Sequence, residues 1–281
     1  MIVDAHHHLW DPAEADYPWM VGVYEPVRRR FDADDLAGVL DANGVVGSVV
    51  VQARASLGET RSLLAAAHAS PRILGVVGWA DLTSLGLARD LERLRREPGG
   101  ELLVGVRHQA HDEPDRAWLL RPDVQRGVAT VGEAGLAFDL LVRERELPAA
   151  AELARRHPGM RFVLDHAGKP PLAHGDLATW HREIDALAAC ENVSCKLSGL
   201  VTEADLDAWS VEQLLLPLRH ALARFGPERS MFGSDWPVCL LAASYAQVLA
   251  LVRSAIEDLD EPACLAVLAG TATRCYRLAI A

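Results

Sequence analysis

The stretch VDAHHHLW, residues 3–10, places three consecutive histidines inside an apolar run. A purification tag usually has more histidines and glycine- or serine-rich neighbours, so we treat these as native residues. Side chains two positions apart on a β-strand share a face, so His6 and His8 should point to one side and His7 to the other. The stretch therefore predicts a first strand that presents two imidazoles on the same side.

The residues after this strand decide between two α/β architectures. A doubly wound open sheet that binds a nucleotide carries a G-x-G-x-x-G turn after its first strand, and here histidines stand in that place. In a (β/α)8 barrel, reactive side chains gather at the C-terminal ends of the strands. We therefore expect an α/β fold of the (β/α)8 TIM-barrel type, regular or distorted, with the open sheet as the alternative.

The rest of the chain alternates strand and helix patterns. Eight short runs rich in Val, Leu, Ile and Phe are nearly continuous in apolar character, which is typical of parallel strands covered on both faces. These predicted strands are residues 2–8, 47–53, 73–80, 103–109, 137–142, 161–167, 192–198 and 230–236. Helical patterns lie between them at residues 34–43, 84–96, 147–157, 176–190, 211–225 and 244–258.

Three further features fit this alternation. The first helix should begin at a cap, Asp32 or Asp34, and end at Gly44. Residues 11–30 form a long loop after the first strand, where barrels keep functional loops. The apolar stretch from residue 262 should form a closing helix.

The composition favours one domain, residues 1–281, that acts on a small molecule. Half of the residues (50%) are hydrophobic, which is enough for a large core. The net charge of −11 and a pI near 5.4 argue against nucleic acid and anionic membranes, because both reward clustered Lys and Arg. The five cysteines contain no C-x-x-C pair and are typical of reduced thiols. Without a signal-peptide or membrane-span pattern, we expect a cytoplasmic protein, monomeric or homodimeric.

Four residues at strand ends are candidate metal ligands. Two inward imidazoles, His6 and His8, suit a divalent metal, which takes a neutral histidine nitrogen at about 2.0–2.1 Å and needs further ligands. His166 and Asp235 end the sixth and eighth runs and should reach the same end of the barrel. The alternatives are that the histidines are satisfied core residues and that Asp235 only caps a turn. Asp165 should alternate away from its neighbour His166, toward the outer layer.

A second set of residues is expected to line the barrel mouth and contact substrate. The only two lysines, Lys169 and Lys196, both fall at predicted strand ends, where an ammonium can hold hydroxyls or a carboxylate. Other members of the set are Gln52, Trp79, His108 and Trp236. Five histidines in helices or loops are expected to be exposed: His111, His157, His174, His181 and His220.

Taken in order, several strand-end motifs resemble one known family. The motifs are VDAHHHLWDP, VQA, GVRH, FVLDHAGKP, VSCKLSG and MFGSDWPV, and they extend from residue 3 to about residue 240. They resemble the amidohydrolase superfamily, in its subgroup of 2-pyrone-4,6-dicarboxylate-lactonase-like and sugar-lactonase proteins. The resemblance implies a distorted barrel that hydrolyses lactones, either without a metal or with one divalent ion, for which we expect zinc.

By position, the resemblance implies that His6, His8, His166 and Asp235 are catalytic residues and, where a metal is bound, its ligands. The fifth strand, AFDLLV, offers only Asp139 where binuclear members have a histidine ligand, and no carboxylated bridging lysine is evident. A binuclear mechanism is therefore not expected.

The chemistry that follows is the hydrolysis of a lactone. Asp235 should accept a proton from a water, metal-bound or free, that attacks the lactone carbonyl. The three histidines should stabilise the oxyanion, directly or through a metal. His108 and the two lysines should orient substrate oxygens. Three tryptophans, Trp10, Trp79 and Trp236, should offer flat faces to a sugar ring.

The expected mouth is richer in Trp, His, Gln and Lys than in Arg, which favours a neutral sugar lactone of the fucono- or rhamnono- type. The runner-up is a dicarboxylate lactone, with Arg54 and Arg107 as clamps. A metal-dependent decarboxylase and a catalytically silent lactone-binding module remain as further alternatives. The presence of Asp235 argues against the silent module, because a binder has no need of a base.

Overall fold

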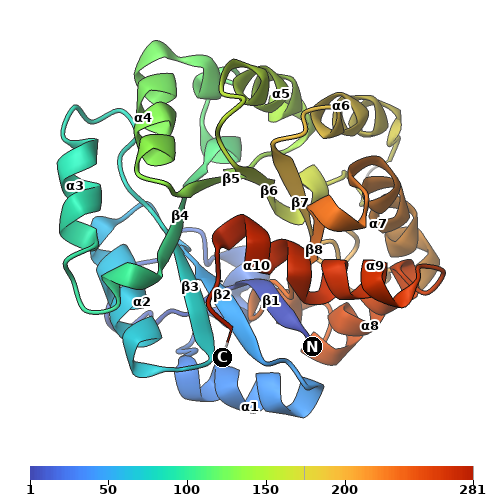
Figure 1. Ribbon diagram of the computed structural model, residues 1–281. Coiled ribbons are helices and arrows are strands. Elements are labelled where there is room, and N and C mark those ends of the chain that lie inside the picture. Colours follow the sequence, from blue (N-terminus) through green and yellow to red (C-terminus); the bar gives the residue numbers. More distant parts are fainter. Residues whose placement is uncertain (174, 281) are drawn as a thin grey trace.

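The computed structural model describes residues 1–173 and 175–280, and its centre is a ring of eight parallel strands (Figure 1). The strands are β1 (Val3–His7), β2 (Gly47–Val51), β3 (Ile73–Gly78), β4 (Leu103–Gln109), β5 (Ala137–Leu141), β6 (Phe162–Leu164), β7 (Val193–Leu197) and β8 (Ser230–Phe232). Each strand pairs with the next in sequence order, and a bridge between His7 and Trp236 joins β1 to the segment after β8. The (β/α)8 prediction is confirmed.

Helices surround the ring (Figure 1). They are α1 (Ala33–Asn43), α2 (Leu57–Ala69), α3 (Leu87–Leu94), α4 (Pro122–Glu133), α5 (Leu147–Arg156), α6 (Ala178–Ala188), α7 (Val211–Phe225), α8 (Tyr245–Ala255), α9 (Glu261–Leu265) and α10 (Thr271–Tyr276). Asp32 caps α1 and Gly44 ends it with a φ of 66°, as predicted. The alanine-rich α2 and the proline-started α4 were not among the predicted helices, although both stand where the alternation requires one.

Two strands end three or four residues earlier than predicted, and the backbone explains why. β6 stops at Leu164 and β8 at Phe232. The residues that follow include His166 (φ 54°), Ala167 (φ 49°) and Asp235 (φ 56°), all in the left-handed region that a strand cannot continue through. The chain therefore turns sharply at these two strand ends.

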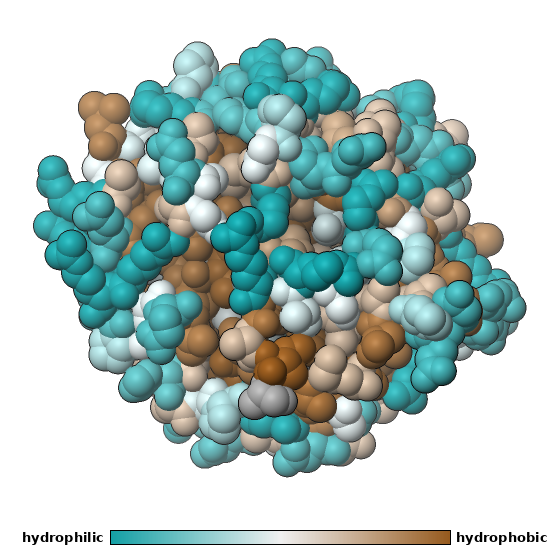
Figure 2. Space-filling view, viewed as in Figure 1, coloured by the Kyte–Doolittle hydropathy of each residue, from teal (hydrophilic) through white to brown (hydrophobic). Residues whose placement is uncertain are grey.

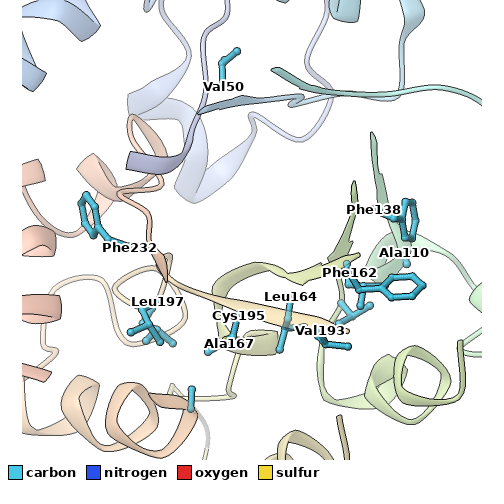
Figure 3. Packing of buried hydrophobic residues seen from close by; sticks show 14 of the residues in the cluster. Val50, Ala110, Phe138, Phe162, Leu164, Ala167, Val193, Cys195, Leu197 and Phe232 are labelled. Carbon is cyan, nitrogen blue, oxygen red and sulfur yellow. The ribbon is translucent and has the colours of Figure 1, made fainter. Parts of the chain in front are cut away.

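Alternate strand residues build two separate cores. Outward-facing side chains such as Val50, Phe138, Phe162, Leu197 and Phe232 belong to the core between the barrel and its helices (Figure 3). Their neighbours in the strands form a second core inside the barrel, which includes Val3, Ala5, Val49, Val51, Ala137, Val163 and Met231. The pairing of β1 with β2 shifts register between Asp4 and His7, so the inward alternation of Val3 and Ala5 does not simply continue into the histidines.

The C-terminal segment covers one end of the barrel, as the predicted closing helix should. Residues Ala269, Ala272, Cys275 and Tyr276 pack into the inner core, and α10 lies across the ring of strands near both termini (Figure 1). Figure 2 shows the same end with apolar side chains among hydrophilic ones. Among the described residues, no helix is long and apolar enough to cross a membrane.

Candidate active site

Three imidazoles and one carboxylate meet at the C-terminal ends of the strands. His6 Nε2 lies 3.2 Å from His8 Nε2. Asp235 Oδ1 lies 3.4 Å from His8 Nε2, 3.7 Å from His6 Nε2 and 3.9 Å from His166 Nε2. All four residues are buried. The structure therefore brings together the four residues predicted as catalytic and metal-binding.

The left-handed turns after β6 and β8 place two of these side chains. Asp235 is held by the hydrogen bond that its N–H donates to the carbonyl oxygen of His6, at 2.8 Å. The His166 ring lies against Gly199, where an added Cβ would come within 2.3 Å of His166 Nδ1. Non-glycine residues in left-handed backbone cost energy and tend to cluster at functional sites. Gly199 in the motif SCKLSG is the sequence signal for this close approach.

Hydrogen bonds at Nδ1 indicate which nitrogen of each histidine is free. His8 Nδ1 donates to the Val51 carbonyl at 2.7 Å, and His166 Nδ1 lies 2.9 Å from Ser198 Oγ. Burial lowers the pKa of His166 to about 4. Burial, and next the Lys196 ammonium, hold the pKa of His6 well below its usual range. His6 and His166 are therefore neutral near pH 7, as metal-ligating histidines must be.

The cluster fits a divalent metal. An ion bound tetrahedrally at 2.0–2.1 Å has ligand atoms about 3.3–3.4 Å from one another. The His6–His8 distance of 3.2 Å and the His8–Asp235 distance of 3.4 Å are close to this value, and the distances from Asp235 to His6 and His166, 3.7 and 3.9 Å, are somewhat longer. Asp235 Oδ1 is buried without a hydrogen-bond partner, which is costly for a carboxylate unless an ion or a ligand compensates it. His6, His8 and Asp235 form one candidate metal-binding group, and His6, Asp165 and His166 form another.

The prediction that Asp165 faces the outer layer is wrong. Because β6 ends at Leu164, strand alternation no longer applies to Asp165, and its side chain turns into the barrel. Its Oδ2 accepts a hydrogen bond from Arg107 Nη1 at 2.9 Å, and its Oδ1 lies 2.9 Å from Lys196 Nζ. Asp165 Oδ1 also lies 3.3 Å from His6 Nδ1, and Lys196 Nζ lies nearer to the same nitrogen, at 3.1 Å.

Lys196 and Gln52 lie beneath the cluster and are not in contact with a cavity, so their predicted substrate contacts are wrong. The Lys196 side chain is 0% exposed and lies 2.6 Å from Asp139 Oδ2. Gln52 is also fully buried, and its amide donates to the Arg107 carbonyl. A strand-end residue can thus point into the barrel and still lie too deep for substrate.

A cavity of about 330 Å³ opens above the cluster. Its floor includes His8, His166, Asp235 and Arg107. Its walls are formed by Trp19, Tyr24, Gln109, His111, Arg143, Lys169, Thr202 and Val238, among others. Of the residues predicted to contact substrate, Lys169 is the one that lines this cavity.

Four other predicted substrate residues do not line this cavity and have protein partners, so their contact with substrate remains a prediction. Trp10 donates to the Val27 carbonyl, and Trp79 donates to His108 Nδ1 at 3.2 Å. His108 also stacks on Trp118 with ring centroids 4.1 Å apart. Trp236 is buried with its ring edge against Phe31. The aromatic walls are instead Trp19 and Tyr24, from the 11–30 loop that was expected to be functional.

The cavity wall carries two cations, of which the sequence predicted Lys169 and missed Arg143. Arg143 Nη1 and Lys169 Nζ bind the two oxygens of Glu203, at 2.6 and 2.5 Å. The two cations share the Glu203 carboxylate, and Asp112 adds a second acid to the same wall. Arg143 stands two residues after β5, where the strand-end rule could have found it. Arg54, the predicted partner of Arg107 in a dicarboxylate clamp, lines a different cavity of about 320 Å³.

Histidines predicted to be exposed are partly buried. The side chain of His111 is 17% exposed and lines the cavity. Burial, and next the charge of Lys169, lower its pKa to about 3. His157, His181 and His220 are also partly buried; His157 follows the end of α5, and His181 and His220 lie on α6 and α7. His174 lies outside the described residues.

Comparisons with known proteins point to one family. Residues 3–278 match the family model described as Amidohydrolase. An L-fucono-1,5-lactonase of Burkholderia multivorans is 44% identical over 287 residues, which cover 98% of this chain and 96% of the relative. An L-rhamnono-gamma-lactonase of Scheffersomyces stipitis is 25% identical over 58% of this chain and 54% of its own. A crystal structure of an amidohydrolase from Burkholderia multivorans with bound zinc is 44% identical, covers 99% of this chain and 100% of that chain, and has a TM-score of 0.94.

Proposed function

The chain belongs to the amidohydrolase family, and from this membership we propose that it hydrolyses the ring ester of a sugar lactone, with L-fucono-1,5-lactone as the first candidate substrate. The observation that carries the proposal is the buried, unpaired Asp235 Oδ1 among three histidine nitrogens at the floor of a cavity. The lactonase relatives at 44% and 39% identity support the substrate class.

Asp235 is the proposed general base. Burial alone would raise the pKa of Asp235, but the neighbouring histidines, His166 first, outweigh it and hold this pKa below its usual range. The carboxylate is therefore ionised near neutral pH and can take a proton from water as that water attacks the lactone carbonyl. The ring C–O bond then breaks, the proton passes to the leaving ring oxygen, and the product is a hydroxy acid.

A metal would be held by His6, His8, His166 and Asp235, and zinc is the proposed ion. When bound, such an ion polarises the carbonyl and lowers the pKa of water. The zinc-bound crystal structure of the 44% identical amidohydrolase supports this assignment. Arg107 lies 3.4 Å from His6 Nε2 and lines the same floor, so its charge would add to the stabilisation of a developing oxyanion.

The cavity suits a neutral polyol. Gln109, His111 and Thr202 offer hydrogen-bonding groups, and Trp19 and Tyr24 offer aromatic faces. Arg143 and Lys169 are already paired with Glu203, so they can donate to hydroxyls without demanding a carboxylate from the substrate. This arrangement favours a sugar lactone over a dicarboxylate.

The test is acid release from a panel of lactones, followed with a pH indicator and corrected for spontaneous hydrolysis. The panel contains L-fucono-1,5-lactone, L-rhamnono-γ-lactone and 2-pyrone-4,6-dicarboxylate, with protein that has been chelator-treated and then supplemented with zinc. We expect turnover of the sugar lactones and its loss on zinc removal. Carbon dioxide release from an aromatic acid, or thermal stabilisation by a lactone without turnover, would contradict the proposal in favour of a decarboxylase or a binding module.

A further inference from the structure

The segment after β2 forms part of the cavity, and a buried carboxylate on α2 holds its backbone. Glu59, in the first turn of α2, is 4% exposed. Its Oε2 accepts hydrogen bonds from the backbone N–H groups of Ala53, at 3.1 Å, and of Arg54, at 3.0 Å. Ala53 lines the cavity above the histidine cluster, whereas Glu59 faces the other cavity, of about 320 Å³. Glu59 takes no part in the proposed hydrolysis, so these hydrogen bonds need a separate explanation.

The hydrogen bond from Arg54 fixes the direction of the Ala53 carbonyl. Ala53 C=O and Arg54 N–H belong to one planar peptide unit, which is trans. In a trans peptide these two groups point in opposite directions. Because the N–H of Arg54 points to Glu59, the carbonyl of Ala53 must point to the opposite side. There it accepts a hydrogen bond from Trp19 Nε1 at 3.0 Å.

Trp19 belongs to the aromatic wall of the cavity. Its ring meets that of Tyr24 edge to face, with centroids 5.5 Å apart, and both residues line the cavity. The indole is only partly buried, so packing alone leaves it more freedom than a core ring has. The hydrogen bond to Ala53 removes part of that freedom. The direction of the Ala53 carbonyl therefore affects how the aromatic wall is placed.

We propose that Glu59 is a positioning residue for substrate binding, which turns the Ala53 carbonyl toward Trp19 and thereby holds the indole ring at the cavity wall. The inference rests on the proposed function, because it takes the ring of Trp19 to face the sugar lactone. Asp235, His8 and His166 are held by hydrogen bonds of their own. Loss of the Glu59 carboxylate should therefore weaken substrate binding and leave the chemical step intact.

The decisive variant is Glu59→Met in the full chain, which fills a similar volume without an oxygen acceptor. We expect KM for L-fucono-1,5-lactone to rise about 3–10-fold, which corresponds to the loss of one aromatic contact, and kcat to change less than about twofold. Glu59→Gln keeps a carbonyl oxygen whose two lone pairs can accept from both N–H groups. Its KM should stay within about twofold of that of the parent chain.

Trp19→Phe breaks the same link at its other end, because it keeps an aromatic ring and removes the indole N–H. Its KM should rise as well. In the double variant Glu59→Met/Trp19→Phe, KM should exceed that of the more affected single variant by less than about twofold, because both changes break one connection. Two independent effects would multiply.

Thr60→Val is the matched control, because Thr60 is the next residue of α2 and also binds the backbone just after a strand. Its hydroxyl accepts from the Trp79 N–H at 2.8 Å and donates to the Trp79 carbonyl at 2.9 Å. Thr60 is 0% exposed, and neither Thr60 nor Trp79 lines the cavity above the histidines. Thr60→Val should destabilise the fold but leave KM within about twofold of that of the parent chain.

A second measurement needs no turnover. In protein labelled with 5-fluorotryptophan, the ¹⁹F NMR line of Trp19 is the one that disappears in Trp19→Phe. This line should shift or broaden in Glu59→Met and should stay in place in Thr60→Val.

Each outcome decides the question. An unchanged KM or an unchanged Trp19 line in Glu59→Met, multiplied effects in the double variant, or an equal rise of KM in Thr60→Val would each overturn the proposal. If Glu59→Met does not fold, Glu59→Asp replaces it, because its carboxylate is one methylene too short for both N–H groups; an unchanged KM there would count against us. A parent chain that opens no lactone contradicts the proposed function. A parent chain that opens lactones and is matched by Glu59→Met in KM contradicts only this inference.

Discussion

Asp4 and Asp139 are two fully buried carboxylates that each accept a hydrogen bond from a tyrosine, yet their other partners differ. Asp4 accepts from Ser234 Oγ at 2.6 Å and from the backbone N–H groups of Ser234 and His6, at 2.9 and 3.1 Å. Asp139 has a buried lysine at 2.6 Å instead. Burial raises the pKa of each to about 6.

The difference teaches that one site needs two kinds of support. Asp4 ties β1 to the segment after β8 and so fixes where the backbone places His6 and Asp235. Asp139 touches no backbone group of the site and acts on a charge. The first kind of support sets positions, and the second balances a buried charge beneath the histidines.

The largest expected effect comes from replacing Asp235, the proposed general base. Asp235→Asn should lower kcat by about 10²- to 10⁴-fold, because an amide cannot take the proton from water. Steady-state acid release at saturating zinc measures this, with Asp4→Asn as the control that keeps the base. Full activity in Asp235→Asn would contradict the assignment of Asp235 as the general base.

The next largest effect is expected from replacing Asp4, which ties β1 to the segment after β8. Asp4→Ala leaves two buried N–H groups and two hydroxyls without their acceptor, and each unpaired buried group costs about 1–3 kcal/mol. We expect the free energy of unfolding, from urea titration, to fall by about 2–5 kcal/mol. Asp4→Asn keeps one acceptor oxygen and should lose much less. An equal loss of unfolding free energy in both variants would show that the charge of Asp4, rather than its acceptor oxygens, ties β1 to the segment after β8.

A third buried acid extends the comparison to pH. Glu59 accepts from the backbone N–H groups of Ala53 and Arg54, and burial raises its pKa from 4.5 to about 7. The folded state therefore holds this proton more tightly than the unfolded state. The stability that this proton contributes is present below about pH 4.5 and is lost as pH rises through 7.

Glu59→Gln should remove this contribution to the pH dependence. The stability of the parent chain relative to that of the variant should fall by about 2–3 kcal/mol between pH 4.5 and pH 7.5. Urea titrations of both chains across this range measure the difference. A difference that stays constant or grows with pH would contradict the raised pKa.

The smallest expected effects come from the two tyrosines. Tyr245→Phe and Tyr276→Phe each remove one hydroxyl from a buried carboxylate and should each lower the free energy of unfolding by about 1 kcal/mol. Neither removes a charge, so zinc affinity should change less than about threefold in both. Chemical denaturation and chelator competition on the pair test this. A much larger zinc effect in Tyr276→Phe than in Tyr245→Phe would show that the metal site depends on the hydrogen bond from Tyr276 to Asp139.

The sequence predicted the barrel and the four residues of the histidine cluster because both follow from local patterns. Apolar runs at regular intervals predict parallel strands, and polar residues just after such runs predict side chains at the mouth of a barrel. The direction of Asp165 could not be predicted, because it depends on β6 ending at Leu164. The depth of Lys196 depends on Asp139, which lies 57 residues away in sequence and has no local signal. The aromatic cavity wall was missed because Trp19 and Tyr24 belong to a loop whose fold follows no periodicity.

The covering of the barrel end by α10 has a consequence for ionic strength. The charges of Asp139 and Lys196 lie between α10 and the histidine cluster, without contact with solvent. At ordinary salt concentrations, dissolved ions screen the interaction between exposed charges that are more than about 8–10 Å apart. Buried pairs are screened much less. Added salt should therefore weaken the attraction of Arg143 and Lys169 for the carboxylate of the hydroxy-acid product. It should leave the interaction between Asp139 and Lys196 unchanged.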